Sequence, residues 1–342
     1  MAEPKPIILI LGPTAGGKTE LAVELAKRLG ALEVPGAELI VADSMQVYRG
    51  LDIGTAKSTA AQRRQVPHHL LDLVDPWTEG FSVDRWLELA EAAITEIRTR
   101  GRYPIVVGGT NLYVQALLEG LLDGPGPDAA LRRQLETAGL DDLRRRLARI
   151  DPAAAQRIHP NDRKRTVRAI EVFASTGLPI SQLQSQWGQS TPRRDVRIIG
   201  LDYSSGSINA RINARVRQMI ADGLLAETHR IWVGGNLGRQ ASVALGYRQL
   251  IDHLQGRWSL SEAVEQIKIR TRRLAGKQRS WLKRFRGHPD SVWIKADDLT
   301  PQELVAKALG VVRGRPGESR HDRDCSPIGA LGADGVCFIE PV

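Results

Sequence analysis

The feature that most constrains this chain of 342 residues is the octet Gly12-Pro13-Thr14-Ala15-Gly16-Gly17-Lys18-Thr19. The octet matches the phosphate-loop pattern GxxxxGK(S/T) at every fixed position, and we call it the phosphate loop. The apolar run Ile7–Leu11 before it predicts a buried strand, and Glu20–Lys27 after it predicts an amphipathic helix. A strand, loop and helix in this order indicate a loop that binds a di- or triphosphate.

Each residue type in the phosphate loop suits a bound phosphate. Glycines allow backbone N–H groups to turn inward, and the N-terminus of the following helix favours an anion. Lys18 adds a cation, and the hydroxyl of Thr19 is placed to bind Mg²⁺. A glycine-rich turn without a ligand is the alternative interpretation. The loop alone does not indicate which reaction the chain catalyses.

The composition favours a polyanionic partner. The chain has 48 Lys and Arg against 39 Asp and Glu, which gives a net charge of +9. Nucleic acid is the first expectation and an anionic membrane the second, although a generically basic protein remains an alternative. Two cysteines, Cys325 and Cys337, support neither a disulfide framework nor a four-ligand zinc site. No membrane span or secretory signal is evident, so we expect a cytoplasmic enzyme.

Strand-like and helix-like segments alternate over residues 7–123, which is typical of a parallel sheet. The helical pattern is clearest over Ser82–Arg100. A returning strand and a short strand follow much later in the chain. The expected strands are Ile7–Leu11, Glu38–Ala42, Leu70–Leu73 (the weakest), Tyr103–Val107, Arg197–Asp202 and Val292–Ile294.

A helical insertion separates the two parts of this sheet. Gly124–Pro127 breaks the pattern, and the residues after it contain helix formers and many arginines but no convincing strand. We therefore predict an α/β fold, a P-loop NTPase-like parallel sheet flanked by helices, with an all-helical insertion domain. The core takes residues 1–124 and 196–312, the insertion takes 125–195, and a tail at 313–342 is expected to be disordered.

The acidic residue that hydrolases need is not at its usual place. A phosphate-loop hydrolase carries an apolar strand that ends in Asp, but Pro104–Val107 is followed by Gly108-Gly109-Thr110. Instead, the strand Glu38–Ala42 is followed by Asp43. Because ligands bind at the carboxyl ends of parallel strands, Asp43 and Thr110 are expected to face the same edge as Lys18. Turn or cap roles for these two residues are the alternative.

The densest basic stretch of the chain is Lys268–Arg286, which carries nine Lys and Arg and no acidic residue. Helical periodicity places its apolar residues on one side, flanked by two basic stripes. Those apolar residues are Leu274, Ala275, Trp281, Leu282 and Phe285, together with Ile267 just before the stretch. A solvated helix face normally mixes charges of both signs, so the single sign favours contact with phosphates of a nucleic acid.

Several blocks, in order along the chain, resemble the tRNA dimethylallyltransferase family. They are the phosphate loop, Asp43–Tyr48, Asp52–Lys57, Pro67–Asp72, Val107–Tyr113, His159–Asp162 and Gly246–Gln249. The resemblance covers about residues 7–295. It implies transfer of a dimethylallyl group from dimethylallyl diphosphate to N6 of an adenosine. That adenosine lies immediately 3′ of the anticodon in tRNAs that read codons beginning with U. The phosphate loop would then hold the diphosphate that leaves.

The resemblance also implies roles for single residues. Asp43 would accept the proton of the attacking nitrogen, and Thr110 would orient Asp43 or its substrate. Lys18 and Arg215 would bind the diphosphate together with Gly12, Pro13, Thr14, Ala15, Gly16, Gly17 and Thr19. Thr19 would ligate Mg²⁺. Without the resemblance, Arg211 and Arg215 read as two solvated charges four residues apart on a helix.

Contacts with tRNA are implied at several places along the chain, so that the insertion and the core would grip the anticodon stem from two sides. The segment Val243–Leu245 lacks the basic residue that some relatives carry there. The implied contact residues are Asp43, Ser44, Met45, Gln46, Thr110, Arg132, Lys164, Arg165, Thr166, Val167, Arg168, Gly246, Tyr247, Arg248, Lys277, Gln278, Arg279, Trp281, Lys283 and Arg284.

Three other functions are weighed against this hypothesis. An adenylate isopentenyltransferase would use free AMP or ADP as acceptor and would not need residues 125–195. A small-molecule kinase with a phosphate loop would use ATP as donor. A non-catalytic RNA-binding protein would not need Lys18, Thr19 and Asp43. We further expect a monomer, no membrane association and no zinc.

Overall fold

The computed structural model describes residues 4–32, 36–121, 128–185 and 193–314. They form two compact units, which are described separately. The first contains described residues up to Leu117 and from Arg194 onward, and the second contains those from Leu118 to Arg193. The sequence placed these boundaries at 124/125 and 195/196. Most of the predicted tail, both cysteines and the break Gly124–Pro127 lie outside the described residues.

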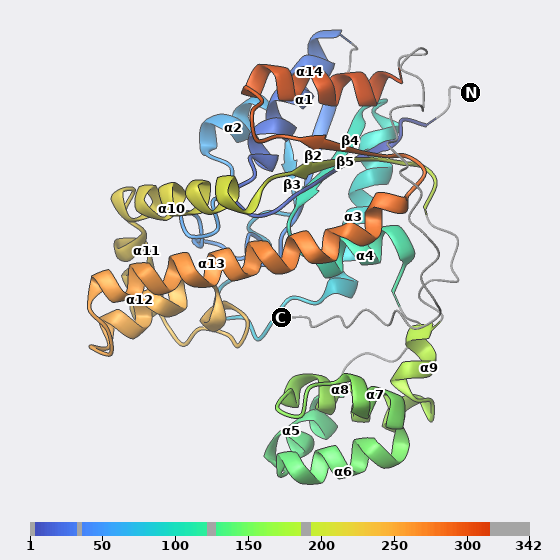
Figure 1. The fold of residues 1–342 in the computed structure, drawn as a ribbon, viewed down its shortest axis with the longest axis vertical. Coiled ribbons are helices and arrows are strands. Elements are labelled where there is room, and N and C mark those ends of the chain that lie inside the picture. Colours follow the sequence, from blue (N-terminus) through green and yellow to red (C-terminus); the bar gives the residue numbers. More distant parts are fainter. Residues whose placement is uncertain (1–3, 33–35, 122–127, 186–192, 315–342) are drawn as a thin grey trace. The chain divides into compact units, whose positions relative to one another are not determined.

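The described part of the first unit is built on a parallel sheet of six strands in the order β3-β2-β4-β1-β5-β6 (Figure 1). The phosphate loop therefore follows an inner strand, with β4 on one side and β5 on the other. The strands are β1 (Ile7–Leu11), β2 (Ala37–Ala42), β3 (His68–His69), β4 (Tyr103–Gly108), β5 (Val196–Asp202) and β6 (Ser291–Lys295).

Of the four inner strands, β1, β2 and β4 are buried at every residue, and β5 is buried at most of its residues. A parallel strand covered on both faces reads as a continuous apolar run, which is why the sequence predicts these strands well. The exception is the predicted strand Leu70–Leu73, which is wrong. Leu70 and Asp72 have φ angles of +64° and +55°, a left-handed backbone that a strand does not tolerate. The edge strand there is His68–His69 instead.

Helices cover both faces of the sheet (Figure 1). α1 and α14 pack together on one face, and α3 lies on the other. The helices of this unit are α1 (Lys18–Leu32), α2 (Ala60–Gln65), α3 (Val83–Thr99), α4 (Asn111–Glu119), α10 (Ser205–Ala221), α11 (Leu224–Val233), α12 (Tyr247–Leu254), α13 (Leu260–Leu282) and α14 (Pro301–Arg313), with 3₁₀ turns η1 (Ala241–Val243) and η2 (Lys283–Gly287).

A buried tryptophan holds α3 against the sheet. Trp86 of α3 is fully buried, stacks on Tyr113 at 4.6 Å between ring centroids, and donates its indole N–H to the carbonyl of Val41 at 2.9 Å. This contact ties α3 to β2.

The basic stretch predicted as one helix is divided, because α13 ends at Leu282 and a 3₁₀ turn follows. Among the helices that the structure describes, none is long and apolar enough to cross a membrane.

The described elements of the second unit are all helices, so the predicted fold class is confirmed. They pack around an apolar core of their own, which includes Leu143, Leu147 and Ile170. Aspartates begin three of these helices by accepting backbone N–H groups, which satisfies the donors of the first turn. The helices are α5 (Ala129–Thr137), α6 (Leu140–Ile150), α7 (Pro152–Arg157), α8 (Arg163–Thr176) and α9 (Ile180–Ser185).

A partly buried ion pair joins α5 and α8 in this unit. The Nε and Nη2 atoms of Arg132 both donate to the carboxylate of Glu171 at 2.6 Å. The Glu171 side chain is 1% exposed, and Arg168 approaches it only to 3.6 Å. Glu171 raises the pKa of Arg132. The guanidinium that the sequence assigned to tRNA is therefore already used within the unit.

We expect Arg132→Met to destabilise this unit by about 3 kcal/mol, because it leaves a buried carboxylate with one distant cation. Arg133→Met is the matched control, since Arg133 is the exposed neighbour on the same helix. The free energy of unfolding of this unit is measured for both variants by urea titration, with hydrogen exchange of the backbone amides in α5 and α8 as the readout. Equal stability of the two variants would contradict the account. Arg132→Met combined with Glu171→Leu should recover most of the loss, because both charges are then removed.

Candidate active site

The phosphate loop makes a tight turn between β1 and α1. Ala15 and Gly17 have φ angles of +60° and +76°, and the N–H of Gly16 donates to the carbonyl of Pro13 at 3.1 Å. A Cβ added to Gly16 would lie 2.9 Å from that carbonyl oxygen, so glycine is required there. The N–H groups at the start of α1, from Gly17 to Thr19, have no acceptors within the helix and remain for a ligand.

Side chains from distant parts of the chain hold this loop in place. They come from α13, from α10 and from the residue after β5. The N–H of Thr14 donates to Gln278 Oε1 at 2.8 Å, Arg211 Nε donates to the carbonyl of Ala15 at 2.8 Å, and the hydroxyl of Tyr203 donates to the carbonyl of Gly16 at 2.9 Å. The loop is thus fixed on both sides without any ligand.

Sequence reasoning missed two of these holding residues. Arg211 was noticed only as a possible solvated charge, and its side chain also lies over the ring of Tyr203 at 5.3 Å. Tyr203 directly follows the returning strand β5, and that position next to a strand end was the only available signal. Neither residue belongs to a motif that the sequence makes visible.

Two cations, Lys18 and Arg215, lie at the phosphate loop without a carboxylate in direct contact among the described residues. Lys18 donates to the carbonyl of Pro13 at 2.8 Å. Burial, and to a lesser extent nearby Arg215, lower the pKa of Lys18 to about 8, against the opposing effect of Asp43 and Glu20. Burial also lowers the pKa of Arg215. Among the described residues, neither cation forms an ion pair with a carboxylate. An anion at this place would stabilise both charges.

Asp43 and Thr110 lie at the neighbouring strand ends, as expected. Asp43 Oδ1 accepts the N–H groups of Met45 at 2.8 Å and Gln46 at 3.3 Å, so one oxygen forms a turn. Its Oδ2 has no hydrogen-bond donor among the described residues. The hydroxyl of Thr110 accepts the N–H of Ser44 at 2.9 Å rather than bonding Asp43. Thr110 therefore orients the segment after Asp43, and Asp43 serves as a turn residue with one free oxygen.

The phosphate loop and the end of β4 lie close together. A Cβ added to Gly109 would lie 3.9 Å from Lys18 Nζ and 2.7 Å from Gln278 Nε2. Asp43 acts electrostatically on both Lys18 and Arg215. The structure thus brings together the four predicted catalytic residues at one edge of the sheet.

Most of the predicted tRNA-contact residues fall into two groups. The others are half-exposed and are Asp43, Ser44, Met45, Gln46, Thr110 and Arg132. One group is exposed or half-exposed and carries the basic charge, and in it Arg284 lies over the ring of Trp281 at 5.3 Å. That group consists of Lys164, Arg165, Arg168, Arg248, Lys277, Arg279, Trp281, Lys283 and Arg284. The other group is buried, so direct side-chain contact with RNA is not available to it in this arrangement. It consists of Thr166, Val167, Gly246, Tyr247 and Gln278.

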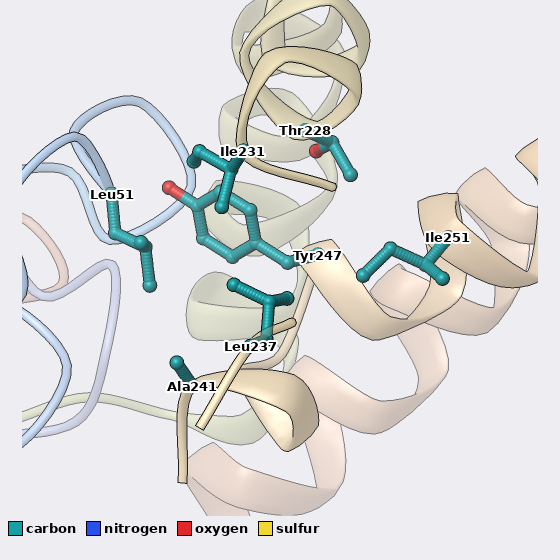
Figure 2. A pocket seen from close by; sticks show the side chains of 7 residues that line it. All are labelled: Leu51, Thr228, Ile231, Leu237, Ala241, Tyr247 and Ile251. Atoms are coloured by element: carbon teal, nitrogen blue, oxygen red, sulfur yellow. The ribbon is translucent and has the colours of Figure 1, made fainter. Parts of the chain in front are cut away.

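Tyr247 shows why a motif residue can be structural. Its hydroxyl donates to buried Glu227 at 2.6 Å, and Glu227 also accepts the N–H of Ile53 at 3.0 Å. Burial, and then Glu227, raise the pKa of Tyr247. Figure 2 shows its ring in an apolar crevice with Leu51, and this crevice has no room for a water molecule. Tyr247 therefore holds the loop after Leu51 against α11.

The residues present suit Mg²⁺ only in the company of phosphates. Among the described residues, no three His, Cys, Asp or Glu side chains gather to hold a metal ion. The hydroxyl of Thr19, at the start of α1, is half-exposed and makes no hydrogen bond with another described residue. Mg²⁺ commonly takes one or two protein oxygens and completes its shell with substrate phosphates and water. A single hydroxyl beside a phosphate loop is consistent with this coordination.

Comparisons with known proteins agree with one another. The IPP transferase family matches residues 46–285, and the Isopentenyl transferase family matches residues 5–75. The tRNA dimethylallyltransferase of Anaeromyxobacter dehalogenans is 46% identical over 305 residues, which is 88% of this chain and 98% of the relative. The crystal structure of the full-length tRNA isopentenylpyrophosphate transferase of Bacillus halodurans is 38% identical, with a TM-score of 0.65, over 91% of this chain and 96% of that chain. A eukaryotic dimethylallyltransferase acting on tRNA is 27% identical, with a TM-score of 0.77, over 92% of this chain and 81% of that chain.

The low pKa of Lys18 makes anion binding depend on pH. A bound anion requires the protonated amine, and free Lys18 loses its proton at about 8. The dissociation constant of pyrophosphate should therefore rise as pH increases from about 7 to about 9.5, approaching tenfold per pH unit above the pKa. Isothermal titration calorimetry measures it. Lys18→Arg is the control, because arginine stays charged over this pH range. Pyrophosphate itself titrates equally in both experiments, so its effect drops out when the two dissociation constants are divided. If the dissociation constant of the wild type divided by that of Lys18→Arg does not change between pH about 7 and about 9.5, the account is contradicted.

Proposed function

The chain belongs to the tRNA dimethylallyltransferase family, and we propose that its donor is dimethylallyl diphosphate. The acceptor is N6 of the adenosine immediately 3′ of the anticodon, in tRNAs that read codons beginning with U. The products are N6-(dimethylallyl)adenosine and diphosphate. The observation that carries the proposal is the pair of cations without an ion-pair partner, Lys18 and Arg215, near the free oxygen of Asp43.

The phosphate loop stabilises the leaving group in this reaction. The bond between C1 of the dimethylallyl group and the bridging oxygen breaks, and its electron pair stays on the diphosphate. Donors that are fixed before the reaction are most effective where this charge develops. The N–H groups of residues 17–19, the amine of Lys18 and the guanidinium of Arg215 provide such donors. Mg²⁺ would add further positive charge, and the hydroxyl of Thr19 is the group that would hold it.

Asp43 acts on the attacking nitrogen. The lone pair of N6 is delocalised into the adenine ring, so the nitrogen is a weak nucleophile until it loses a proton. As N6 bonds to C1, its proton passes to Asp43 Oδ2. The two N–H groups on Oδ1 fix the carboxyl in one orientation. General-base assistance of this kind contributes about 10²–10⁴ to the rate.

Exposed cations on each unit support RNA binding. In the first unit they are concentrated on α13 and η2, for example Lys277 and Lys283, and in the second on α8, for example Lys164. Contacts of this kind neutralise phosphates and position the RNA without reading its sequence. The reactive adenine is in a loop, so moving it out of its stack requires less energy than in a duplex. That the enzyme works as a monomer in the cytoplasm stays a prediction.

A donor comparison tests this function. Purified protein, Mg²⁺ and total tRNA lacking the modification are incubated with dimethylallyl diphosphate or with ATP, and the nucleosides are analysed by mass spectrometry. We expect N6-(dimethylallyl)adenosine only with dimethylallyl diphosphate. Free AMP in place of tRNA should give no product. Phosphoryl transfer from ATP, or equal use of AMP, would favour the kinase or the adenylate isopentenyltransferase instead.

The matched variant in this assay is Asp43→Asn. Asparagine keeps an oxygen for the N–H groups of Met45 and Gln46 but cannot accept a proton at the other position. The rate constant kcat should fall by about 10²–10⁴ while the dissociation constants of tRNA and pyrophosphate stay within about twofold. Turnover like that of the wild type would exclude Asp43 as the base.

A further inference from the structure

Gln278 does something other than its sequence context suggests. It lies in the basic run that resembles a tRNA-contact segment, between Lys277 and Arg279. Lys277 is exposed and Arg279 is half-exposed, with its guanidinium donating to Ser205 Oγ at 2.6 Å, whereas Gln278 is only 6% exposed. Its side chain is directed inward from α13, so it has almost no surface on which RNA could lie.

Both polar atoms of Gln278 are bonded, each to a different part of the site. Its Oε1 accepts the N–H of Thr14 at 2.8 Å, and its Nε2 donates to the carbonyl of Gly109 at 2.8 Å. Thr14 belongs to the phosphate loop, which holds the donor. Gly109 directly precedes Thr110, on the side where Asp43 and the acceptor lie. A single amide thus joins the donor side to the acceptor side.

The sheet itself does not supply this link. The ladder between β1 and β4 pairs Ile8 with Ile105 and reaches as far as Ile10 with Val107. Beyond that pair the two segments separate, since β1 leads into the phosphate loop and β4 leads to Gly109. Gln278 bridges them at the point where the ladder has stopped. A Cβ at Gly109 would lie 2.7 Å from Gln278 Nε2, so a larger residue there would displace the amide from this position.

We propose that Gln278 is a positioning residue that sets the distance between bound diphosphate and the attacking adenine, and that it does not contact RNA. This inference rests on the proposed function. Reacting atoms must be held about 3–3.5 Å apart, and a misplacement of about 1 Å lowers the rate by about 10². The amide has one correct orientation, because its oxygen meets an N–H and its nitrogen meets a carbonyl.

The first test removes both hydrogen bonds and keeps the shape, with Gln278→Met. We expect kcat at saturating substrates to fall between about 10- and 100-fold. The dissociation constant of an anticodon stem-loop RNA, measured by fluorescence anisotropy, should change less than about twofold. Lys277→Gln should weaken RNA binding and leave kcat at saturating substrates nearly unchanged. Gln302→Met, an exposed substitution on α14, should change neither quantity.

The second test distinguishes positioning from simple packing, with Gln278→Glu. A protonated glutamic acid has the shape of glutamine and can donate to Gly109 and accept from Thr14, whereas the carboxylate repels the Gly109 carbonyl. The rate of Gln278→Glu divided by that of the wild type should therefore rise as pH is lowered. The same ratio for Gln278→Met should not depend on pH, because methionine does not titrate.

Three results would overturn the inference. They are an unchanged kcat in Gln278→Met, a loss of RNA binding as large as that of Lys277→Gln, and a pH-independent ratio for Gln278→Glu. Each of these can occur while the wild type is fully active, and then the proposed function stands. A wild type that transfers no dimethylallyl group would overturn the proposed function, and this inference with it.

Discussion

The site depends on two cations, Lys18 and Arg215, that no carboxylate of the described residues contacts directly. Lys18 and Arg215 lie near each other, and the pKa of each is lowered, mainly by burial. Two cations in such surroundings disfavour each other until an anion arrives, so the empty site is electrostatically unfavourable and the anion-bound site is not. Functional sites commonly concentrate perturbed groups of this kind. The rest of the first unit is arranged to keep the phosphate loop where these charges can act.

The phosphate loop is held by residues that are far apart in the chain. Gln278 and Arg211 bind it from two helices, and Tyr203 binds it from the end of β5. A loop fixed on both sides does not need to reorganise when charge develops on the leaving group, which is the condition for electrostatic stabilisation of a transition state. The helix that carries the exposed basic residues thus also contributes a buried contact to the chemistry.

Much of this arrangement could be predicted from the sequence. The inner strands are recognisable because strands buried on both faces are continuously apolar, and the phosphate loop is recognisable because its glycines and Lys18 occur in a strand–loop–helix context. The strand predicted at Leu70–Leu73 failed because two of its residues adopt a left-handed backbone, which side-chain type does not reveal. The holding role of Tyr203 has only a weak sequence signal, its position directly after a strand, because the contact itself follows from tertiary packing.

Gln278 was predictable in part. It lies three residues after Ala275 and four before Leu282, both buried, so helical spacing places it on the inner side of α13. The basic residues around it concealed that position. Tyr247 illustrates a different limit, since a motif identifies residues that matter without showing whether they touch the substrate or support those that do. Its implied contact with tRNA stays a prediction.

The central claim is that the phosphate loop retains a leaving group, so that a carbon–oxygen bond breaks and no phosphoryl group moves. Dimethylallyl diphosphate labelled with oxygen-18 at the bridging position tests it directly. Mass spectrometry of the products should find the label in the released diphosphate, with none on a five-carbon alcohol. Label retained on dimethylallyl alcohol, or phosphate found on the RNA, would mean that a phosphorus–oxygen bond is broken and would contradict the account.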